Sequence, residues 1–102
     1  MNLASFAKEN ILQCIGNTPI VSLQRLAPHL SVNLYGKCEY LNPGGSIKDR
    51  LGLHIINMAE KRGLIKPGGT IIEATSGNTG LGLAMVAALR GYACIFVMAD
   101  KQ

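Results

Sequence analysis

The sequence has few of the residues that mark several common classes of protein. It contains no Trp, its aromatic residues make up 5% of the 102 residues, and its three cysteines show no Cys-x-x-Cys spacing. An odd number of cysteines without that spacing argues against a disulfide framework and against a zinc site. Because hydrophobic residues still make up 48% of the chain, we expect one domain with an aliphatic core.

Clustered charge and long apolar runs are also lacking. The net charge is +4, but the ten basic residues are scattered from Lys8 to Lys101, which does not resemble a nucleic-acid footprint. No apolar run is long enough to cross a membrane, and the first residues lack the charged-then-apolar order of a secretory signal. We therefore expect a cytoplasmic protein that binds neither nucleic acid nor membranes.

Turn residues divide the chain into short apolar segments. Their patterns predict a short helix over Asn10–Gln13 and strands over Ile20–Leu23, Val32–Cys38, Thr70–Ala74 and Ala93–Met98. Two longer helices are predicted, one from a cap at Ser46 to about Arg62 and one from about Asn78 or Thr79 to Arg90. The order β-α-β-α-β after residue 32 predicts a parallel sheet with right-handed crossovers. The last strand is nearly continuous in apolar residues, so we expect both of its faces to be covered.

The segment Gly44–Arg50 (GGSIKDR) is the first of two informative motifs. Ser46 and Asp49 have the spacing of a capping box, which places Lys48 in the first turn of its helix. The helix dipole and partial burial there both disfavour the ammonium form, and a neutral amine is what attack on an aldehyde needs. The alternative is a solvated first turn with no chemical role. The apolar spacing predicts that this helix buries Ile47, Leu51, Ile55, Met58 and Ala59.

The segment Thr75–Gly80 (TSGNTG) is the second motif. It follows a predicted strand and precedes a helix, which is where parallel α/β sheets bind ligands. Free N–H groups there, together with hydroxyl side chains, suit a carboxylate or a phosphate. The alternative is an ordinary well-capped helix, because Ser, Thr and Asn are common caps. The nearby run Gly77–Gly82 is G-x-x-G-x-G, which is the wrong order for a dinucleotide fingerprint.

As an ordered pair, the two motifs predict a Schiff-base lysine and an anion cradle, which are two halves of a pyridoxal-phosphate site. Together with Ile15–Pro19 (IGNTP) and Lys37–Asn42 (KCEYLN), they make the chain similar to the cysteine synthase / cystathionine β-synthase family of fold-type II pyridoxal-phosphate enzymes. The resemblance covers nearly the whole chain. It implies an α/β fold, namely an incomplete three-layer parallel-sheet unit similar to the tryptophan synthase β-subunit.

The resemblance also implies roles for individual residues. Lys48 would carry pyridoxal 5′-phosphate and remove the Cα proton of the substrate. Asn78 would contact the cofactor's ring hydroxyl, and the α-carboxylate would be bound by Thr75, Ser76, Gly77, Asn78 and Thr79. Ser-Ile-Lys and Gly-Asn-Thr at the two motifs favour β-replacement over deamination. The reaction implied is replacement at Cβ of serine or O-acylated serine by a thiol or sulfide, giving cystathionine or cysteine. Neither a metal nor haem is expected.

The resemblance places some parts of the family's site in later sequence. The glycine-rich phosphate loop and the partner of the pyridine nitrogen both lie there in the family. Residues 1–102 are therefore expected to be the N-terminal part of a catalytic domain, inactive alone and homodimeric when full-length. Which thiol is the acceptor stays open, although Lys37–Tyr40 and Gly91–Met98 favour the cystathionine β-synthase type. The alternative function is a truncated, non-catalytic fragment or partner-binding module of the same fold.

Overall fold

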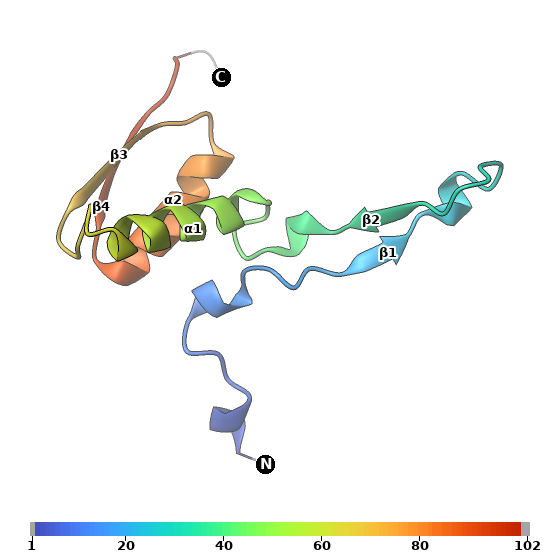
Figure 1. The fold of residues 1–102 in the computed structure, drawn as a ribbon, viewed down its shortest axis with the longest axis horizontal. Helices are drawn as coiled ribbons and strands as arrows, with labels where there is room; N and C mark the ends of the chain where they lie inside the picture. The colour runs from blue at the N-terminus through green and yellow to red at the C-terminus, as the bar shows by residue number, and fades with distance from the viewer. Residues whose placement is uncertain (1, 101–102) are drawn as a thin grey trace.

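The computed structural model describes residues 2–100, which form an α/β unit with an extended arm at one side (Figure 1). The unit contains helix α1 (Lys48–Lys61), strand β3 (Thr70–Ala74), helix α2 (Asn78–Arg90) and strand β4 (Ala93–Val97). Strands β3 and β4 are parallel, with Ile72 opposite Ile95. These boundaries agree with the predicted ones to within two residues, because Gly63 and Gly91 follow the helices at the predicted places.

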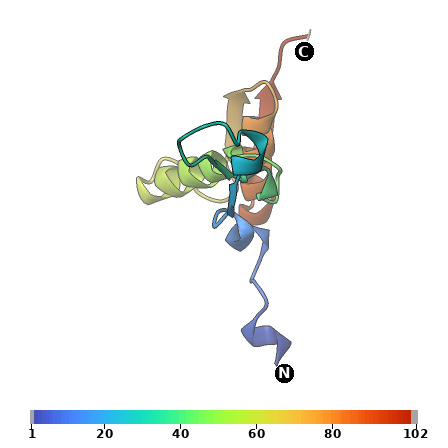
Figure 2. The same ribbon diagram turned by 90° about the vertical axis from the view of Figure 1, so that its right-hand side faces the viewer.

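The arm consists of strands β1 (Ile20–Ser22) and β2 (Tyr35–Lys37) and the segment that joins them. The two strands pair antiparallel, and Figure 2 views this arm end-on. The predicted parallel β-α-β-α-β sheet is therefore wrong in its first strand, since β2 pairs with β1 and only β3 and β4 are parallel. The physical reason is local: antiparallel strands need only a short connection, so β1 pairs with β2 before the chain reaches α1. Short 3-10 helices complete the described structure, at Leu3–Ser5, Ile11–Cys14, Gln24–Leu26 and Glu39–Leu41.

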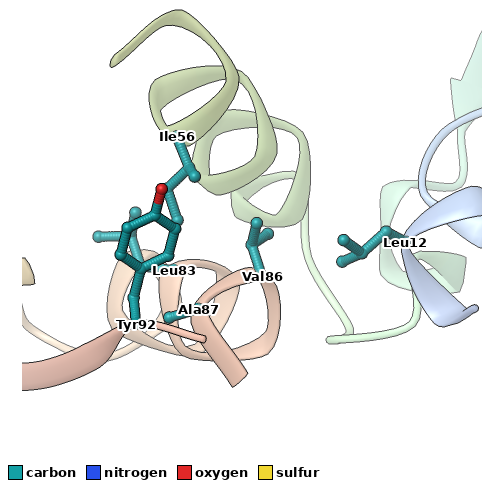
Figure 3. Packing of buried hydrophobic residues seen from close by; sticks show 6 residues of the cluster. All are labelled: Leu12, Ile56, Leu83, Val86, Ala87 and Tyr92. Atoms are coloured by element: carbon teal, nitrogen blue, oxygen red, sulfur yellow. The ribbon is translucent and has the colours of Figure 1, made fainter. Parts of the chain in front are cut away.

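The core lies between the two helices. Ile56 of α1 packs with Leu83, Val86 and Ala87 of α2, and Tyr92 closes the cluster at the start of β4 (Figure 3). Leu12 reaches the same cluster from the 3-10 helix Ile11–Cys14. The core is aliphatic apart from Tyr92, as the composition predicted.

The predicted buried face of α1 is wrong. Ile47, Leu51 and Ile55 are exposed by 55%, 38% and 42%, and Met58 and Ala59 are only half-buried. The buried positions of the helix are Asp49, Gly52 and Ile56. The spacing rule selects the large apolar residues, whereas the contact with α2 is made through a glycine.

One face of the β3–β4 sheet is also open. Ile71, Cys94 and Phe96 pack toward the helices, but Ile72, Ile95 and Val97 on the opposite face are exposed by 66%, 52% and 58%. The prediction that both faces of the last strand are covered is therefore wrong for the described residues. No helix in residues 2–100 is both long enough and apolar enough to span a membrane.

Candidate functional site

Lys48 is the first residue of α1 and is half-buried. The hydroxyl of Ser46 accepts a hydrogen bond from the Lys48 N–H at 3.1 Å. The Asp49 carboxylate does not close the predicted capping box, because it accepts from the Gly44 N–H at 2.5 Å instead. Asp49 is fully buried, so the alternative of a solvated first turn is wrong at this residue. The glycine turn is thus held against the helix that begins with the lysine.

The loop between β3 and α2 is ordered by Thr75. The Thr75 N–H donates to the carbonyl of Val97 at 3.1 Å, which ties the loop to the end of β4. The Thr75 hydroxyl oxygen accepts from the N–H groups of Gly77 and Gly80 at 3.2 and 3.0 Å. It can still donate its own hydrogen to a ligand. Thr75 therefore supplies the side-chain cap that the alternative interpretation requires, and it is the only side chain of the described loop that does so.

The remaining groups of this loop stay available to a ligand. The N–H groups of Asn78 and Thr79, in the first turn of α2, have no acceptor in the described part of the chain. Ser76 and Asn78 are exposed, and Thr79 is half-buried. Because unpaired N–H groups at a helix start favour an anion, the second motif has the geometry of an anion site.

Two glycines bring the two motifs together. A Cβ atom on Gly52 of α1 would lie 2.6 Å from the Gly82 backbone, and one on Gly82 of α2 would lie 2.5 Å from the Lys48 carbonyl oxygen. Neither distance leaves room for a side chain, so the helices pack backbone against backbone. This contact places Lys48, at the beginning of α1, beside Gly82 in the N-terminal half of α2. Gly82 is four residues after Asn78, the first residue of α2.

Two hollows flank the motifs. One of about 390 Å³ lies beside Lys48 and is bordered by Ile47, Leu51 and His54. The other, of about 310 Å³, lies beside Thr75 and Gly77 and is lined mainly by apolar atoms of Leu81, Phe96 and Met98. They are separate in the described residues. No residue borders both hollows, so the link between the motifs is the backbone contact of the two helices.

Sequence reasoning missed a group of polar residues beside the turn that precedes Lys48. Arg50 pairs with Glu39 at 2.6 Å, and Thr18 and Asn42 also bind Glu39. Arg50 and Thr18 are 11 and 21 residues from Glu39 in the sequence, so no local spacing rule identifies them as its partners. The only signal in the sequence was that Thr18, Glu39, Asn42 and Arg50 all lie in the segments that carry the family resemblance.

The model of the family described as "Pyridoxal-phosphate dependent enzyme" matches residues 11–102. The chain belongs to this family. The predicted family and its cofactor, pyridoxal phosphate, are therefore confirmed, and so is the α/β fold of an incomplete unit.

Individual members of the family are similar to this chain over most of its length. It is 55% identical to cystathionine beta-synthase of Apis mellifera over 95 residues, covering 91% of this chain and 19% of that protein. It is 52% identical to cysteine synthase of Staphylococcus aureus (strain Mu50) over 94 residues, covering 92% and 30%. The crystal structure of O-ureido-L-serine synthase superposes with a TM-score of 0.87 at 56% identity, covering 93% and 30%. The chain thus spans less than a third of the length of these relatives.

Proposed function

We propose that residues 1–102 form the N-terminal part of the catalytic domain of a longer pyridoxal-phosphate enzyme that catalyses β-replacement. The donor is serine or O-acylated serine, the acceptor is a thiol or sulfide, and the product is cystathionine or cysteine. The observation that carries this proposal is the backbone contact between Lys48 and Gly82, which sets a lone helix-start lysine beside an anion-binding helix start.

The names of the relatives support the type of reaction. Cystathionine, cysteine and O-ureido-L-serine are all amino acids that carry a heteroatom on Cβ, and each names the product of a relative. Replacement at Cβ is therefore the chemistry that these names share. Homodimeric assembly, a cytoplasmic location and the identity of the sulfur acceptor stay predictions.

The residues present fit pyridoxal phosphate in the parts that this chain supplies. Lys48 would hold the cofactor through its amine, and the Asn78 amide would contact the ring hydroxyl. Bound there, pyridoxal phosphate supplies an electron sink for negative charge at the substrate Cα. The fit rests on the unpaired N–H groups of Asn78 and Thr79 and on the glycine contact that brings Lys48 near them.

Each residue then has a defined task during the reaction. The N–H groups of Asn78 and Thr79, with the hydroxyls of Thr75 and Ser76, hold the substrate carboxylate. Lys48, its amine freed when the substrate amino group takes its place, would take the proton from Cα, and the hydroxyl or acyloxy group would leave Cβ with its electron pair. The acceptor, as a thiolate or hydrosulfide, would form the new bond from sulfur to Cβ, its lost proton would neutralise the leaving group, and Lys48 would return the proton to Cα.

Borohydride trapping tests the assignment of the lysine. The natural protein is loaded with pyridoxal phosphate, reduced with borohydride, digested, and mapped by mass spectrometry. We expect the label on Lys48, no specific label in Lys48→Ala, and no rescue in Lys48→Arg, because a guanidinium is neither a usable amine nor a base. A label on Lys37 or Lys61 instead would contradict the proposal.

A β-replacement assay then tests the reaction. The natural protein is incubated with serine or O-acetylserine and with sulfide or homocysteine, and the amino-acid products are measured. Turnover with one of these pairs is expected. If Lys48 were loaded specifically but no pair gave turnover, the protein would bind pyridoxal phosphate without catalysing β-replacement, and the proposed reaction would be contradicted.

A further inference from the structure

Beside the turn that precedes Lys48, four polar residues form a connected cluster, which we call the clasp: Thr18, Glu39, Asn42 and Arg50. The Arg50 Nε donates to Glu39 Oε1 at 2.6 Å, and Arg50 Nη2 donates to Glu39 Oε2 and to Thr18 Oγ1, both at 3.2 Å. The Thr18 hydroxyl donates to Glu39 Oε2. The Asn42 amide donates to the Glu39 carbonyl at 2.8 Å and to its Oε1 at 3.1 Å. Each carboxylate oxygen of Glu39 therefore accepts two hydrogen bonds, and three residues supply them.

The clasp lies where the chain passes between the arm and the α/β unit. The chain enters the arm after Thr18 and returns at Cys38, whose N–H donates to the Pro19 carbonyl at 2.9 Å. Asn42 also accepts from the Gly16 N–H at 2.8 Å, so both crossing segments are bound to one another. Arg50, in the first turn of α1, joins both of them to the helix that begins with Lys48.

Two residues of the clasp, Asn42 and Thr18, are buried, with exposed fractions of only 3% and 8%. The Arg50 guanidinium holds the pKa of Glu39 at about 2, with help from the Thr18 hydroxyl, and Glu39 in turn raises the pKa of Arg50. Charge-assisted hydrogen bonds of this kind are stronger and more directional than neutral ones.

Residues 42–47, here called the lysine turn, are fixed at both ends. Asn42 at the first end belongs to the clasp, and its carbonyl accepts from the Gly45 N–H at 2.8 Å. Beyond the other end, the first turn of α1 contains Asp49, whose carboxylate accepts a hydrogen bond from the Gly44 N–H. Arg50 follows Asp49 directly in the sequence. The position of the Lys48 backbone is thus determined by contacts on both sides of the turn.

We infer that Glu39 and Arg50 are positioning residues that, through Asn42, hold the lysine turn in place and so determine where Lys48 lies. The part of this inference that concerns cofactor attachment rests on the proposed function. The part that concerns the turn does not. Neither residue touches the reacting atoms in this scheme.

The chain offers a matched control for the test. Arg90 and Glu60 form a second ion pair at 2.7 Å, which ties the far ends of α1 and α2 together. Its side chains are exposed by 30% and 29%, against 38% and 16% for Arg50 and Glu39. Removal of either pair breaks a half-buried ion pair on α1, but only one pair lies beside Lys48.

The experiment compares Glu39→Gln, Arg50→Met and Arg50→Lys with Glu60→Gln and Arg90→Met in the natural protein. The first measurement is hydrogen exchange at the N–H groups of Gly44 and Gly45. The second is the rate at which added pyridoxal phosphate becomes attached to Lys48, followed by borohydride trapping and corrected for the folded fraction. Thermal unfolding of every variant supplies that correction.

We expect the clasp variants to lose exchange protection at Gly44 and Gly45 and to slow attachment at Lys48 by about tenfold or more, since small displacements of a reacting group are costly. Arg50→Lys should behave like Arg50→Met, because an ammonium group lacks the planar fork of donors with which the guanidinium binds Glu39 and Thr18. The Glu60 and Arg90 variants should change neither measurement at equal folded fraction.

Two results would overturn the inference, and a third would overturn the proposed function instead. If both sets of variants slow attachment in proportion to lost stability, the clasp is a structural ion pair with no positioning role. If protection at Gly44 and Gly45 is unchanged in the clasp variants, the clasp does not hold the turn. If the unmodified protein never attaches the cofactor at Lys48, the proposed function fails, while the exchange data still decide whether the clasp holds the turn.

Discussion

Lys48, Asp49 and Arg50 are consecutive in the chain, but their side chains serve three different purposes. Lys48 borders a hollow at the helix start, Asp49 is fully buried beneath the glycine turn, and Arg50 joins the clasp. Asp49 Oδ1 has no hydrogen-bond partner among the described residues, although its other oxygen binds Gly44. A buried carboxylate oxygen without a partner is costly, so the structure retains Asp49 at some expense in stability.

The substrate loop supplies the first prediction at this scale. Ser76→Ala should weaken binding of the amino-acid substrate by about 1.5–3 kcal/mol, the usual contribution of a hydrogen bond to a charged group such as the substrate carboxylate. Cofactor attachment at Lys48 should change little. Substrate titration of the loaded protein, followed by its visible absorbance, measures both quantities.

Thr75→Ala should have a similar effect on substrate binding and a further one on the loop. Its hydroxyl accepts from Gly77 and Gly80, so its loss leaves two loop N–H groups without their acceptor. We therefore expect a lower unfolding temperature for Thr75→Ala than for Ser76→Ala. Variants that lost the cofactor but bound substrate normally would require the roles of the two motifs to be exchanged.

Glu39 supplies a prediction about pH. Its pKa falls from 4.5 to about 2 in the folded protein, chiefly through the Arg50 hydrogen bond. A lowered pKa means that the ionised form is favoured by folding, so this contribution is fully present above pH 4.5 and is lost as the pH falls toward 2. Stability should therefore decline over that range, and the decline should be smaller in Glu39→Gln.

Chemical denaturation at a series of pH values between 6 and 2 measures this decline. The control is Glu73→Gln, because Glu73 is an exposed carboxylate on β3 that takes part in neither ion pair. An equal pH dependence in Glu39→Gln and the unmodified protein would contradict the assignment of the shift to Glu39.

At the scale of elements, the contact between α1 and α2 controls the site. Ala normally stabilises a helix interior by about 0.5–1 kcal/mol relative to Gly. At Gly82, however, a methyl group would overlap the carbonyl of Lys48. We expect Gly82→Ala to lower the free energy of unfolding by roughly 1–3 kcal/mol, as overpacking does, and to separate the two helix starts.

Thermal and denaturant unfolding check the sign of this change. Ala88→Gly, at an exposed position of the same helix, serves as the control and reports helix propensity alone. Stabilisation by Gly82→Ala would show that the helices can move apart without cost.

The elements also show which features of the fold could be predicted from the sequence. Helix and strand boundaries were accessible because glycine and proline mark them locally, as at Gly63 and Gly91. The buried face of α1 was not, because apolar spacing favours Ile47, Leu51 and Ile55 over the small Gly52 that makes the contact. The pairing of β2 with β1 was also missed, since a short strand does not specify its neighbour.

The candidate site was predictable only in its local parts. Lys48 and the Thr75–Thr79 loop are contiguous motifs, so their chemistry could be inferred from residue type and order. The clasp depends on partners far apart in the chain, such as Thr18 and Arg50, which are 32 residues apart. One sequence contains no local signal for such a pairing.

At the scale of the whole molecule, two groups of exposed apolar side chains among the described residues bear on association. One is the sheet face formed by Ile72, Ile95 and Val97, and the other is the α1 face formed by Ile47, Leu51 and Ile55. Exposed apolar surface of this kind favours association, and the open edges of a two-stranded sheet add unpaired backbone groups. We expect residues 1–102 expressed alone to self-associate and to show no β-replacement activity.

Size-exclusion chromatography combined with the β-replacement assay tests the isolated residues. The natural protein, assayed in parallel, is the positive control. A monodisperse monomer of residues 1–102 with measurable turnover would show that the site is complete within these residues.

The glycine contact between α1 and α2 has a consequence for how the core tolerates substitution. At Gly52 and Gly82 the helices meet through backbone atoms, so the spacing of the two helix starts is set at this point by the backbone. We therefore expect core residues such as Ile56 and Leu83 to accept replacements of similar volume with little movement of Lys48 relative to Thr79. The two motifs then depend on two positions that must stay without a side chain, whereas the surrounding core is free to vary in composition.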